Sequence, residues 1–416
     1  MNTQKKILIV APYGFNDRMT NFIEFVTARL LAKNNWQVVA LTRRENEKKS
    51  TDALYGIKIH RYRGLPQGIF FLLKTLIVLN PSIIHVHNLR NNRLGIITAL
   101  LAKLIGTPLV FTEYGLLHNH YLTDDRDDPF NSPIKIDNVI VNIGKIFRRL
   151  RKDRLKTWPE IIKNYFFNWP LTHAGWVIFV SRHNLPIART LGVKKALLLP
   201  QITDDVRWEY KITQQDEKTI KQNNLVLSKI NQIDGRNILF IGQIKRRKGW
   251  DVLLKAIPYV PENIIKKFIF VTSSANAEKP ELLALVNELG IAQRLLFIGQ
   301  VFNSEILKKI YEKSQIVIIP SLYEGFGLVT LEAFEMKKPL IASAVEALTE
   351  TIIDGKNGLL VPPNDPEKLA QTICRLAADQ ALAQKLVAGG KKTLARLKSD
   401  ELKKQWLDFY DSLISK

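Results

Sequence analysis

The chain has 416 residues, of which 46% are hydrophobic and 24% are charged. It can therefore bury a sizeable core, and this balance excludes a mainly disordered polypeptide. The length exceeds the roughly 100–200 residues of one ordinary domain, which predicts two domains. The single cysteine, Cys374, has no second cysteine for an internal disulfide and no cluster to hold a metal, as is typical of a reducing compartment.

The apolar segments do not have the length that a membrane span requires. The N-terminus is polar and leads directly into the strand-like run 7–10, so it lacks the longer apolar stretch of a signal peptide. The longest apolar runs, 68–79 and 94–111, are interrupted by lysine, glycine or proline well before about 20 residues. We therefore expect core helices and strands in a cytoplasmic protein.

Positive charge is concentrated in the first half of the chain. Residues 1–200 carry 30 Lys and Arg against 13 Asp and Glu, whereas residues 201–416 carry 31 against 26. The densest basic stretch begins at Lys145 and ends with an aromatic cluster at Trp169. Two interpretations stay open: attachment to the anionic inner face of a membrane, or an ordinary solvated helix face. Nucleic acid is disfavoured as a partner because no recognised nucleic-acid motif accompanies the charge.

Strand-like apolar runs alternate with helical patterns through most of the chain, which predicts α/β domains with parallel sheets. The pattern stops between 203 and 236, a polar stretch that we interpret as a linker. We expect a Rossmann-like domain over 1–202, a second over 237–398, and a helix over 399–416. The strands are expected at 7–10, 38–41, 57–60, 83–86, 109–112, 177–180 and 197–199, then at 238–241, 268–272, 295–298, 316–319, 340–342 and 359–361.

A glycine-containing loop follows the expected strand 316–319 and leads into a helix. Gly325 and Gly327 would let the backbone approach a ligand closely, and the free N–H groups at the helix start would bind a phosphate. Glu324 in the loop and Glu332 in the helix could accept hydrogen bonds from hydroxyl groups. Glycine spacing alone is also compatible with ordinary turn formers and solvated glutamates.

The pair Glu324 and Glu332, set in Glu-x-Phe-Gly-x-x-x-x-Glu, resembles the signature of the retaining glycosyltransferases of family four, which have the GT-B fold. Three more segments resemble that family in the same order. They are 241–249, similar to Gly-Arg-Leu-x-x-x-Lys-Gly; 297–301, similar to the turn against the nucleotide base; and 355–363, similar to the end of the domain. The resemblance covers the second half of the chain nearly continuously.

This resemblance implies two Rossmann-like domains facing across a cleft that holds a nucleotide-diphosphate sugar. Lys248 would pair with the diphosphate, Glu332 with the ribose, and Glu324 with the transferred sugar. The anomeric configuration would be retained through an oxocarbenium-like sugar, without a metal. The implied donor-binding residues are Gln243, Arg247, Gly299, Val301, Gly325, Phe326, Gly327, Leu328, Val329, Glu332 and Gly14.

The first half of the chain resembles the family less well. Gly14 is alone where the family carries a paired-glycine loop, and Tyr114 stands where many members have a histidine. His118 lies just beyond and could supply an imidazole, so we include it among the candidate catalytic residues with Glu324 and Lys248.

The C-terminal segment 399–416 carries an apolar helical stripe that includes Trp406 and Tyr410. In the family, the corresponding helix crosses back onto the first domain.

The resemblance favours a hexosyltransferase that uses a nucleotide-sugar donor and a glycan or lipid-linked acceptor, in the synthesis of a surface polysaccharide or glycolipid. A degenerate, non-catalytic sugar- or nucleotide-binding protein is the first alternative, because Gln243 replaces a usual arginine and Tyr114 a usual histidine. A glycoside hydrolase using Glu324 and Glu332 is the second, although that chemistry has no need of Lys248. A dinucleotide-dependent oxidoreductase is disfavoured, since no Gly-x-Gly-x-x-Gly follows the first strand.

Overall fold

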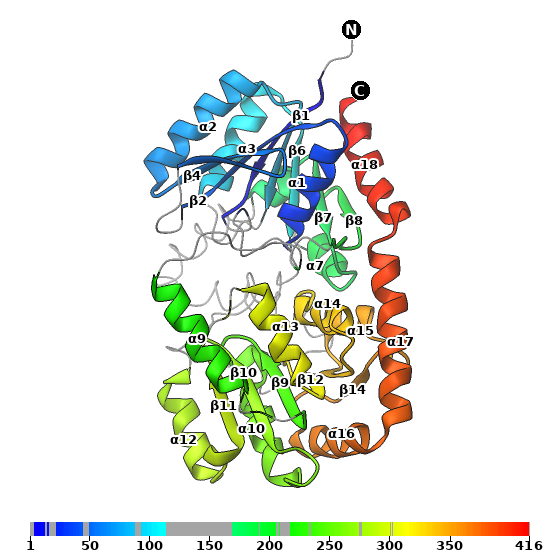
Figure 1. The fold of residues 1–416 in the computed structure, drawn as a ribbon. Coiled ribbons are helices and arrows are strands. Elements are labelled where there is room, and N and C mark those ends of the chain that lie inside the picture. The colour runs from blue at the N-terminus through cyan, green and yellow to red at the C-terminus, as the bar shows by residue number, and fades with distance from the viewer. Residues whose placement is uncertain are drawn as a thin grey trace, which may run out of the picture. The chain divides into compact units, whose positions relative to one another are not determined.

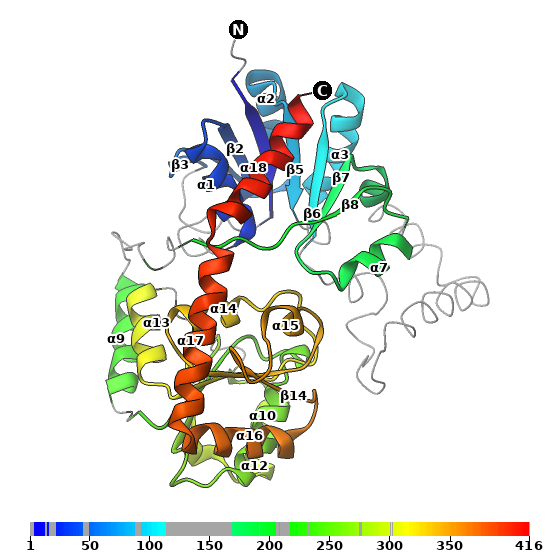
Figure 2. The same ribbon diagram turned by 90° about the vertical axis from the view of Figure 1, so that its right-hand side faces the viewer.

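The chain divides into two compact units, Met1–Asp204 with Lys398–Lys416, and Asp205–Leu397 (Figures 1 and 2). Both are layered α/β structures built around a sheet that is wholly or mainly parallel, which confirms the predicted fold class. The computed structural model describes residues 4–12, 15, 22–44, 50–87, 93–113, 169–190, 192–204, 208, 217–231, 233, 235–273, 277–299, 301 and 303–415.

The first unit contains an eight-stranded sheet with the strand order β3-β4-β2-β1-β5-β6-β7-β8. Its central strands are mainly apolar and are buried on both faces, as parallel strands between two helix layers must be. The strands are β1 (Lys6–Val10), β2 (Gln37–Arg43), β3 (Thr51–Leu54), β4 (Ile57–Tyr62), β5 (Ile83–His87), β6 (Leu109–Glu113), β7 (Trp176–Phe179) and β8 (Ala196–Leu198).

Helices α2 (Leu65–Leu79) and α3 (Arg93–Ile105) pack side by side on one face of this sheet. Their buried side chains join the apolar core made by alternate residues of the strands, for example Leu8 and Val86. The first unit also contains α1 (Ile23–Lys33), α7 (Asn184–Thr190) and α18 (Asp400–Ile414).

Helix α18 returns to the first unit from the far end of the sequence. The hydroxyl of its Tyr410 lies 2.7 Å from Nδ1 of His85 on β5, and the indole of Trp406 donates to the carbonyl of Pro200 at 2.9 Å. Burial lowers the pKa of His85 to about 3, so the ring is neutral and serves as a hydrogen-bonding group. The remote helix is thus an integral part of the first unit.

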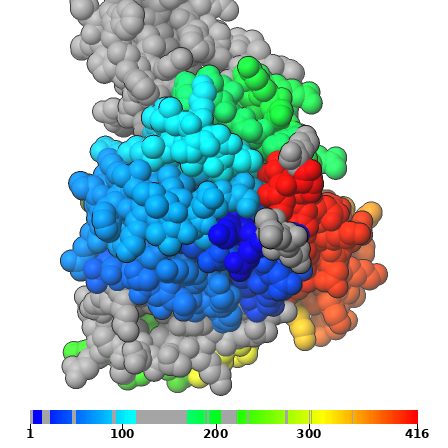
Figure 3. All heavy atoms as spheres, turned by 90° about the horizontal axis from the view of Figure 1, so that it is seen from above, coloured from blue at the N-terminus to red at the C-terminus, as the bar shows by residue number. Residues whose placement is uncertain are grey.

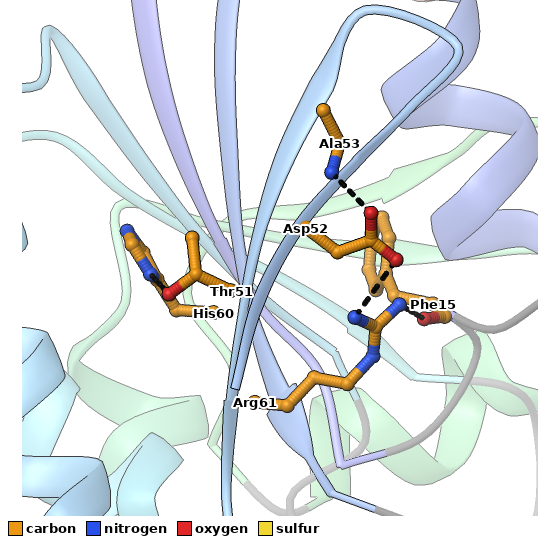
Figure 4. A network of polar contacts seen from close by, with 6 residues as sticks. All are labelled: Phe15, Thr51, Asp52, Ala53, His60 and Arg61. Carbon is orange, nitrogen blue, oxygen red and sulfur yellow. Dashed lines mark hydrogen bonds and ion pairs between the residues drawn. The ribbon is translucent and has the colours of Figure 1, made fainter. Parts of the chain in front are cut away.

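One strand of the first sheet, β3, lies outside the predicted set. It is short and largely exposed, and it pairs antiparallel with β4 at the sheet edge. Figure 4 shows what holds it: the Asp52 carboxylate accepts a hydrogen bond from the buried Arg61 at 3.3 Å, and the Thr51 hydroxyl lies 3.1 Å from Nδ1 of His60. Arg61 also donates to the carbonyl of Phe15 at 3.2 Å. These polar contacts stabilise a strand that has no apolar alternation.

The second unit contains a six-stranded, all-parallel sheet with the order β11-β10-β9-β12-β13-β14. Every strand predicted for this half is present within one or two residues. The strands are β9 (Asn237–Ile241), β10 (Lys267–Val271), β11 (Leu295–Ile298), β12 (Ile316–Ile319), β13 (Leu340–Ser343) and β14 (Leu359–Val361). The main helices are α9 (Glu217–Asn231), α10 (Trp250–Ala256), α12 (Pro280–Glu288), α13 (Ser304–Glu312), α14 (Leu328–Glu335), α15 (Glu346–Thr351), α16 (Pro366–Ala378) and α17 (Gln380–Leu397).

Helix α9 lies inside the segment 203–236 that the sequence predicted to be a linker. It is mostly polar, but it buries Val226 and Ile230 and packs against α13. These two residues are four positions apart, which places both side chains on one face of the helix. The segment therefore includes a structural helix of the second unit as well as connecting chain.

Candidate functional site

Strand order identifies the place in the second sheet where a ligand can enter. From β9 the chain winds outward through β10 and β11, and it then returns to the other side of β9 as β12. The loops that follow β9 and β12 consequently diverge at the carboxyl ends of neighbouring strands, which is the topological switch point of an open parallel sheet. The segments 242–249 and 320–327 are these two loops.

The two loops are held in close contact by backbone groups. The carbonyl of Arg247 accepts hydrogen bonds from the backbone N–H groups of Leu322 at 2.8 Å and Tyr323 at 3.3 Å. Gly249 has a φ of +62°, and a Cβ at this position would lie only 1.7 Å from the carbonyl oxygen of Pro320. Glycine is therefore required both by the backbone conformation and by the close approach of the neighbouring loop.

Lys248 and Glu324, one from each loop, form an ion pair between Nζ and Oε2. Lys248 is the last residue of the 3-10 turn η2 (Arg246–Lys248), and its side chain is 18% exposed, against 10% for Glu324. Glu324 also accepts hydrogen bonds from the Ser321 hydroxyl at 3.3 Å and from the backbone N–H of Gly325 at 3.2 Å. A charged pair thus lies largely buried at the switch point.

The neighbouring charges keep the Glu324 carboxylate ionised. Burial by itself raises the pKa of Glu324, but Lys248, Arg247 and the hydrogen bonds outweigh burial and hold its pKa below the usual value. Burial lowers the pKa of the Lys248 ammonium, and the attraction of Glu324 opposes that effect. The two loops therefore present a carboxylate and an ammonium side by side.

Helix α14 begins directly after this loop, with Gly327 as its N-cap at a φ of +82°. A Cβ on Gly327 would lie 2.5 Å from Leu348, so no larger side chain fits without a rearrangement. The first N–H groups of a helix have no partner within the helix and carry partial positive charge. The start of α14, with Leu328 and Val329, therefore adds N–H donors next to Lys248 that suit an anionic group.

Glu332 lies one turn into α14 and is buried, with 5% of its surface exposed. One carboxylate oxygen, Oε2, accepts a hydrogen bond of 2.8 Å from the hydroxyl of Tyr311 on α13. The ring of Tyr311 is fully buried and meets Trp208 edge to face, with 6.4 Å between the ring centroids. Tyr311 thus fixes the orientation of one of the two signature glutamates.

The remaining candidate donor-binding residues lie around these two loops. Gln243 is exposed, Arg247 is half-buried, and Phe326 is half-buried next to Gly325. Gly299 and Val301 follow β11, two strands from β9 at the same end of the sheet. His118, Gly14 and the basic stretch from Lys145 onward lie outside the described residues, apart from its last member, Trp169.

The sequence did not identify two partners of the signature glutamates. Ser321 lies three residues before Glu324, within the same motif, and that spacing could have indicated a contact. No sequence pattern indicated the contact of Tyr311 with Glu332. Helix α13 also buries Ile306, Leu307 and Ile310, so the spacing of Tyr311 is that of an ordinary core aromatic residue.

No group of three or more His, Cys, Asp or Glu side chains among the described residues is arranged to hold a metal ion. None of their helices combines the length and the apolar character needed to cross a bilayer.

Comparisons with known proteins agree with this geometry. The family profile described as Glycosyl transferases group 1 matches residues 235–379. An uncharacterized glycosyltransferase of Methanocaldococcus jannaschii is 32% identical over 204 residues, which are 49% of this chain and 51% of the relative. A D-inositol 3-phosphate glycosyltransferase of Xylanimonas cellulosilytica is 33% identical over 178 residues, 43% of this chain and 42% of the relative. The chain thus spans about half the length of these curated relatives.

Solved structures extend the likeness of fold to both units. Sucrose-phosphate synthase from Thermosynechococcus elongatus aligns with a TM-score of 0.71 at 21% identity, covering 99% of each chain. HepE from Anabaena, solved in complex with UDP-glucose, aligns with a TM-score of 0.67 at 16% identity over 98% of this chain and 99% of HepE. The matching segment of the second unit is thus similar to the group 1 glycosyltransferases, and the chain as a whole has the GT-B fold.

Proposed function

We propose that this chain is a retaining glycosyltransferase that moves a sugar from a nucleotide-diphosphate donor to a glycan or lipid-linked acceptor, in the synthesis of a surface polysaccharide or glycolipid. The observation that carries the proposal is the buried ion pair between Lys248 and Glu324, next to the start of α14. The names of the relatives support the transferase class, and the UDP-glucose bound to HepE supports the donor class.

The chemistry explains why a cation and helix N–H groups lie together here. Breaking the bond between a sugar and a diphosphate leaves the electron pair, and hence negative charge, on the leaving phosphate oxygen. Positive groups fixed in place beforehand stabilise that charge without reorganising during the reaction. The ammonium of Lys248 has three N–H donors, so it can contact a phosphate and keep its bond to Glu324. The proposed reaction needs no metal.

Glu324 is suited to hold the transferred sugar. Its ionised carboxylate can accept hydrogen bonds from sugar hydroxyls, and its contacts with Ser321 and Gly325 restrict its movement. Glu332, held in place by the hydroxyl of Tyr311, is suited to accept hydrogen bonds from the ribose hydroxyls.

A thermal-shift screen tests the proposal. Nucleoside diphosphates of the common bases and their sugar conjugates are added singly, and the matching donor is expected to raise the unfolding temperature by several degrees. A ligand present at 100 times its Kd adds about 2.7 kcal/mol to the stability of the native state. The anomeric configuration of the product is then determined by NMR, and retention is expected.

Three results of the screen and of activity assays on the same protein would contradict the proposal. Binding without transfer to any acceptor would favour a sugar- or nucleotide-binding protein. Release of sugar from simple glycosides without any nucleotide would favour a hydrolase. An inverted product would exclude the retaining mechanism.

Replacing Tyr311 with phenylalanine tests whether this residue positions Glu332. The change keeps the buried ring and removes the 2.8 Å hydrogen bond to Glu332, so we expect the KM for the donor to rise several-fold while kcat changes little. A steady-state titration of the donor measures both constants. A fall in the unfolding temperature without any change in KM would show that Tyr311 has only a structural role.

A further inference from the structure

The outward face of helices α2 and α3 in the first unit is unusually apolar. In α2 the exposed side chains include Phe70, Leu73, Ile77 and Val78, spaced so that they form one continuous stripe along the helix. Ile77 is 80% exposed and Val78 is 72% exposed, so these side chains are not the rim of a core.

Helix α3 adds a second stripe beside the first. Leu100 and Leu104 are separated by one helical turn, and Ile105 follows directly at the end of the helix. Leu104 is 81% exposed. The two helices pack against each other, and Figure 3 shows their outer surfaces adjoining on the same side of the first unit. Folded proteins rarely leave an extended apolar patch of this kind in water without a partner.

The charges on these helices have only one sign. Neither α2 nor α3 contains an aspartate or a glutamate, whereas they carry Lys74, Arg93 and Lys103, all exposed. Lys74 lies in the middle of the α2 stripe, and with Lys58 it lowers the pKa of His60 on β4, although burial is the larger cause of that shift. The surrounding potential is therefore positive, which favours an anionic partner.

An aromatic side chain extends the patch at its edge. The ammonium of Lys103 lies over the ring of Trp169, 5.3 Å from its centroid. Tryptophan and lysine side chains, each with an apolar body and a polar tip, are enriched where proteins meet the boundary between lipid headgroups and acyl chains.

We propose that the exposed face of α2 and α3, here called the α2–α3 face, docks on an anionic lipid bilayer. The apolar stripes would enter the headgroup boundary while Lys74 and Lys103 pair with anionic headgroups. A second copy of this chain is a poorer occupant. Pairing the face with itself would bring these lysines toward those of the partner, with no carboxylate on either helix to compensate. The inference goes beyond the proposed transferase activity and needs no nucleotide.

Co-sedimentation with lipid vesicles tests the inference on the full chain. One set of vesicles contains phosphatidylcholine alone, and the other contains phosphatidylcholine with phosphatidylglycerol. The key variant combines Ile77→Ser with Leu104→Ser, and a second combines Lys74→Gln with Lys103→Gln. The matched control combines Leu225→Ser with Ile353→Ser, two exposed apolar residues of the second unit that are 58% and 49% exposed. Because all these side chains are exposed, the variants are expected to fold, which their unfolding temperatures check.

We expect the natural chain to bind the anionic vesicles much more strongly than the neutral ones. The Ile77 and Leu104 variant should bind these vesicles at least tenfold more weakly. The lysine variant should bind several-fold more weakly, and its binding should depend less on salt. The control variant should bind as strongly as the natural chain. The proposal would be overturned if the natural chain did not bind anionic vesicles at low salt. It would also be overturned if the Ile77 and Leu104 variant and the control variant lost vesicle binding equally.

Analytical ultracentrifugation of the same samples tests whether a second copy of this chain occupies the α2–α3 face instead. A dimer that the Ile77 and Leu104 variant dissociates, without vesicle binding, would assign the face to a second copy and overturn the lipid proposal. Donor turnover measured without vesicles reports separately on the transferase. The failure of either proposal can thus be told from the failure of the other.

Discussion

Replacing Glu324 or Lys248 with alanine is expected to lower turnover by roughly 10²- to 10³-fold, the usual effect of removing one preorganised group that stabilises transition-state charge. Each substitution also leaves the opposite charge of the pair buried without its partner. The rate of nucleotide release from the matching donor, at saturating concentration, measures the loss.

Controls for this experiment come from the same unit. Lys255→Ala and Glu288→Ala remove exposed charges on α10 and α12, and both should keep turnover within about twofold. The double variant Glu324→Ala with Lys248→Ala should be more stable than the sum of the single losses indicates, because no unpaired charge remains. Unchanged turnover in both single variants would remove these residues from the site and end the proposed mechanism.

Gly249→Ala is expected to destabilise the second unit by at least about 3 kcal/mol and to abolish turnover. The new methyl group would lie 1.7 Å from the carbonyl oxygen of Pro320, so the loops 242–249 and 320–327 would have to separate. Separation would break the hydrogen bonds to the Arg247 carbonyl and move Lys248 away from Glu324. Calorimetry and donor turnover measure the two effects.

Gly290→Ala is the matched control for this clash. Gly290 has nearly the same φ, +64°, but a Cβ there meets no atom within 4 Å. The Gly290→Ala substitution should lower the free energy of unfolding by only about 1 kcal/mol, the strain of an alanine in the left-handed conformation. If Gly249→Ala and Gly290→Ala lost equal amounts of stability, backbone strain alone would account for the requirement for glycine at position 249. The close approach of Pro320 would then play no part.

The strands of both sheets were predictable because each central strand is a run of apolar residues that must be covered on two faces. Such a run, as in β12, has few alternatives to a buried parallel strand. The edge strand β3 was not predictable, since the exposed Thr51–Leu54 has no apolar period and depends on Arg61 and His60 from the neighbouring strand. Helix α9 was missed for a similar reason, because its few apolar residues stand among asparagine, glutamine and lysine.

The site was predictable to the extent that it depends on local sequence. Glycine positions and glutamate spacing located the loop 320–327 and the start of α14, and the strand order brings Lys248 to the same place. The contact of Tyr311 with Glu332 joins two different helices, and no local pattern encodes it.

The return of α18 to the first unit has a consequence for synthesis on the ribosome. The second unit is continuous in sequence, whereas the first needs the helix that carries Trp406 and Tyr410 to complete it. The second unit can therefore fold while the first still waits for its final helix, the reverse of the usual N-terminal-first order of vectorial folding. Until α18 has been synthesised, His85 and the neighbouring sheet surface lack their cover and are open to chaperones.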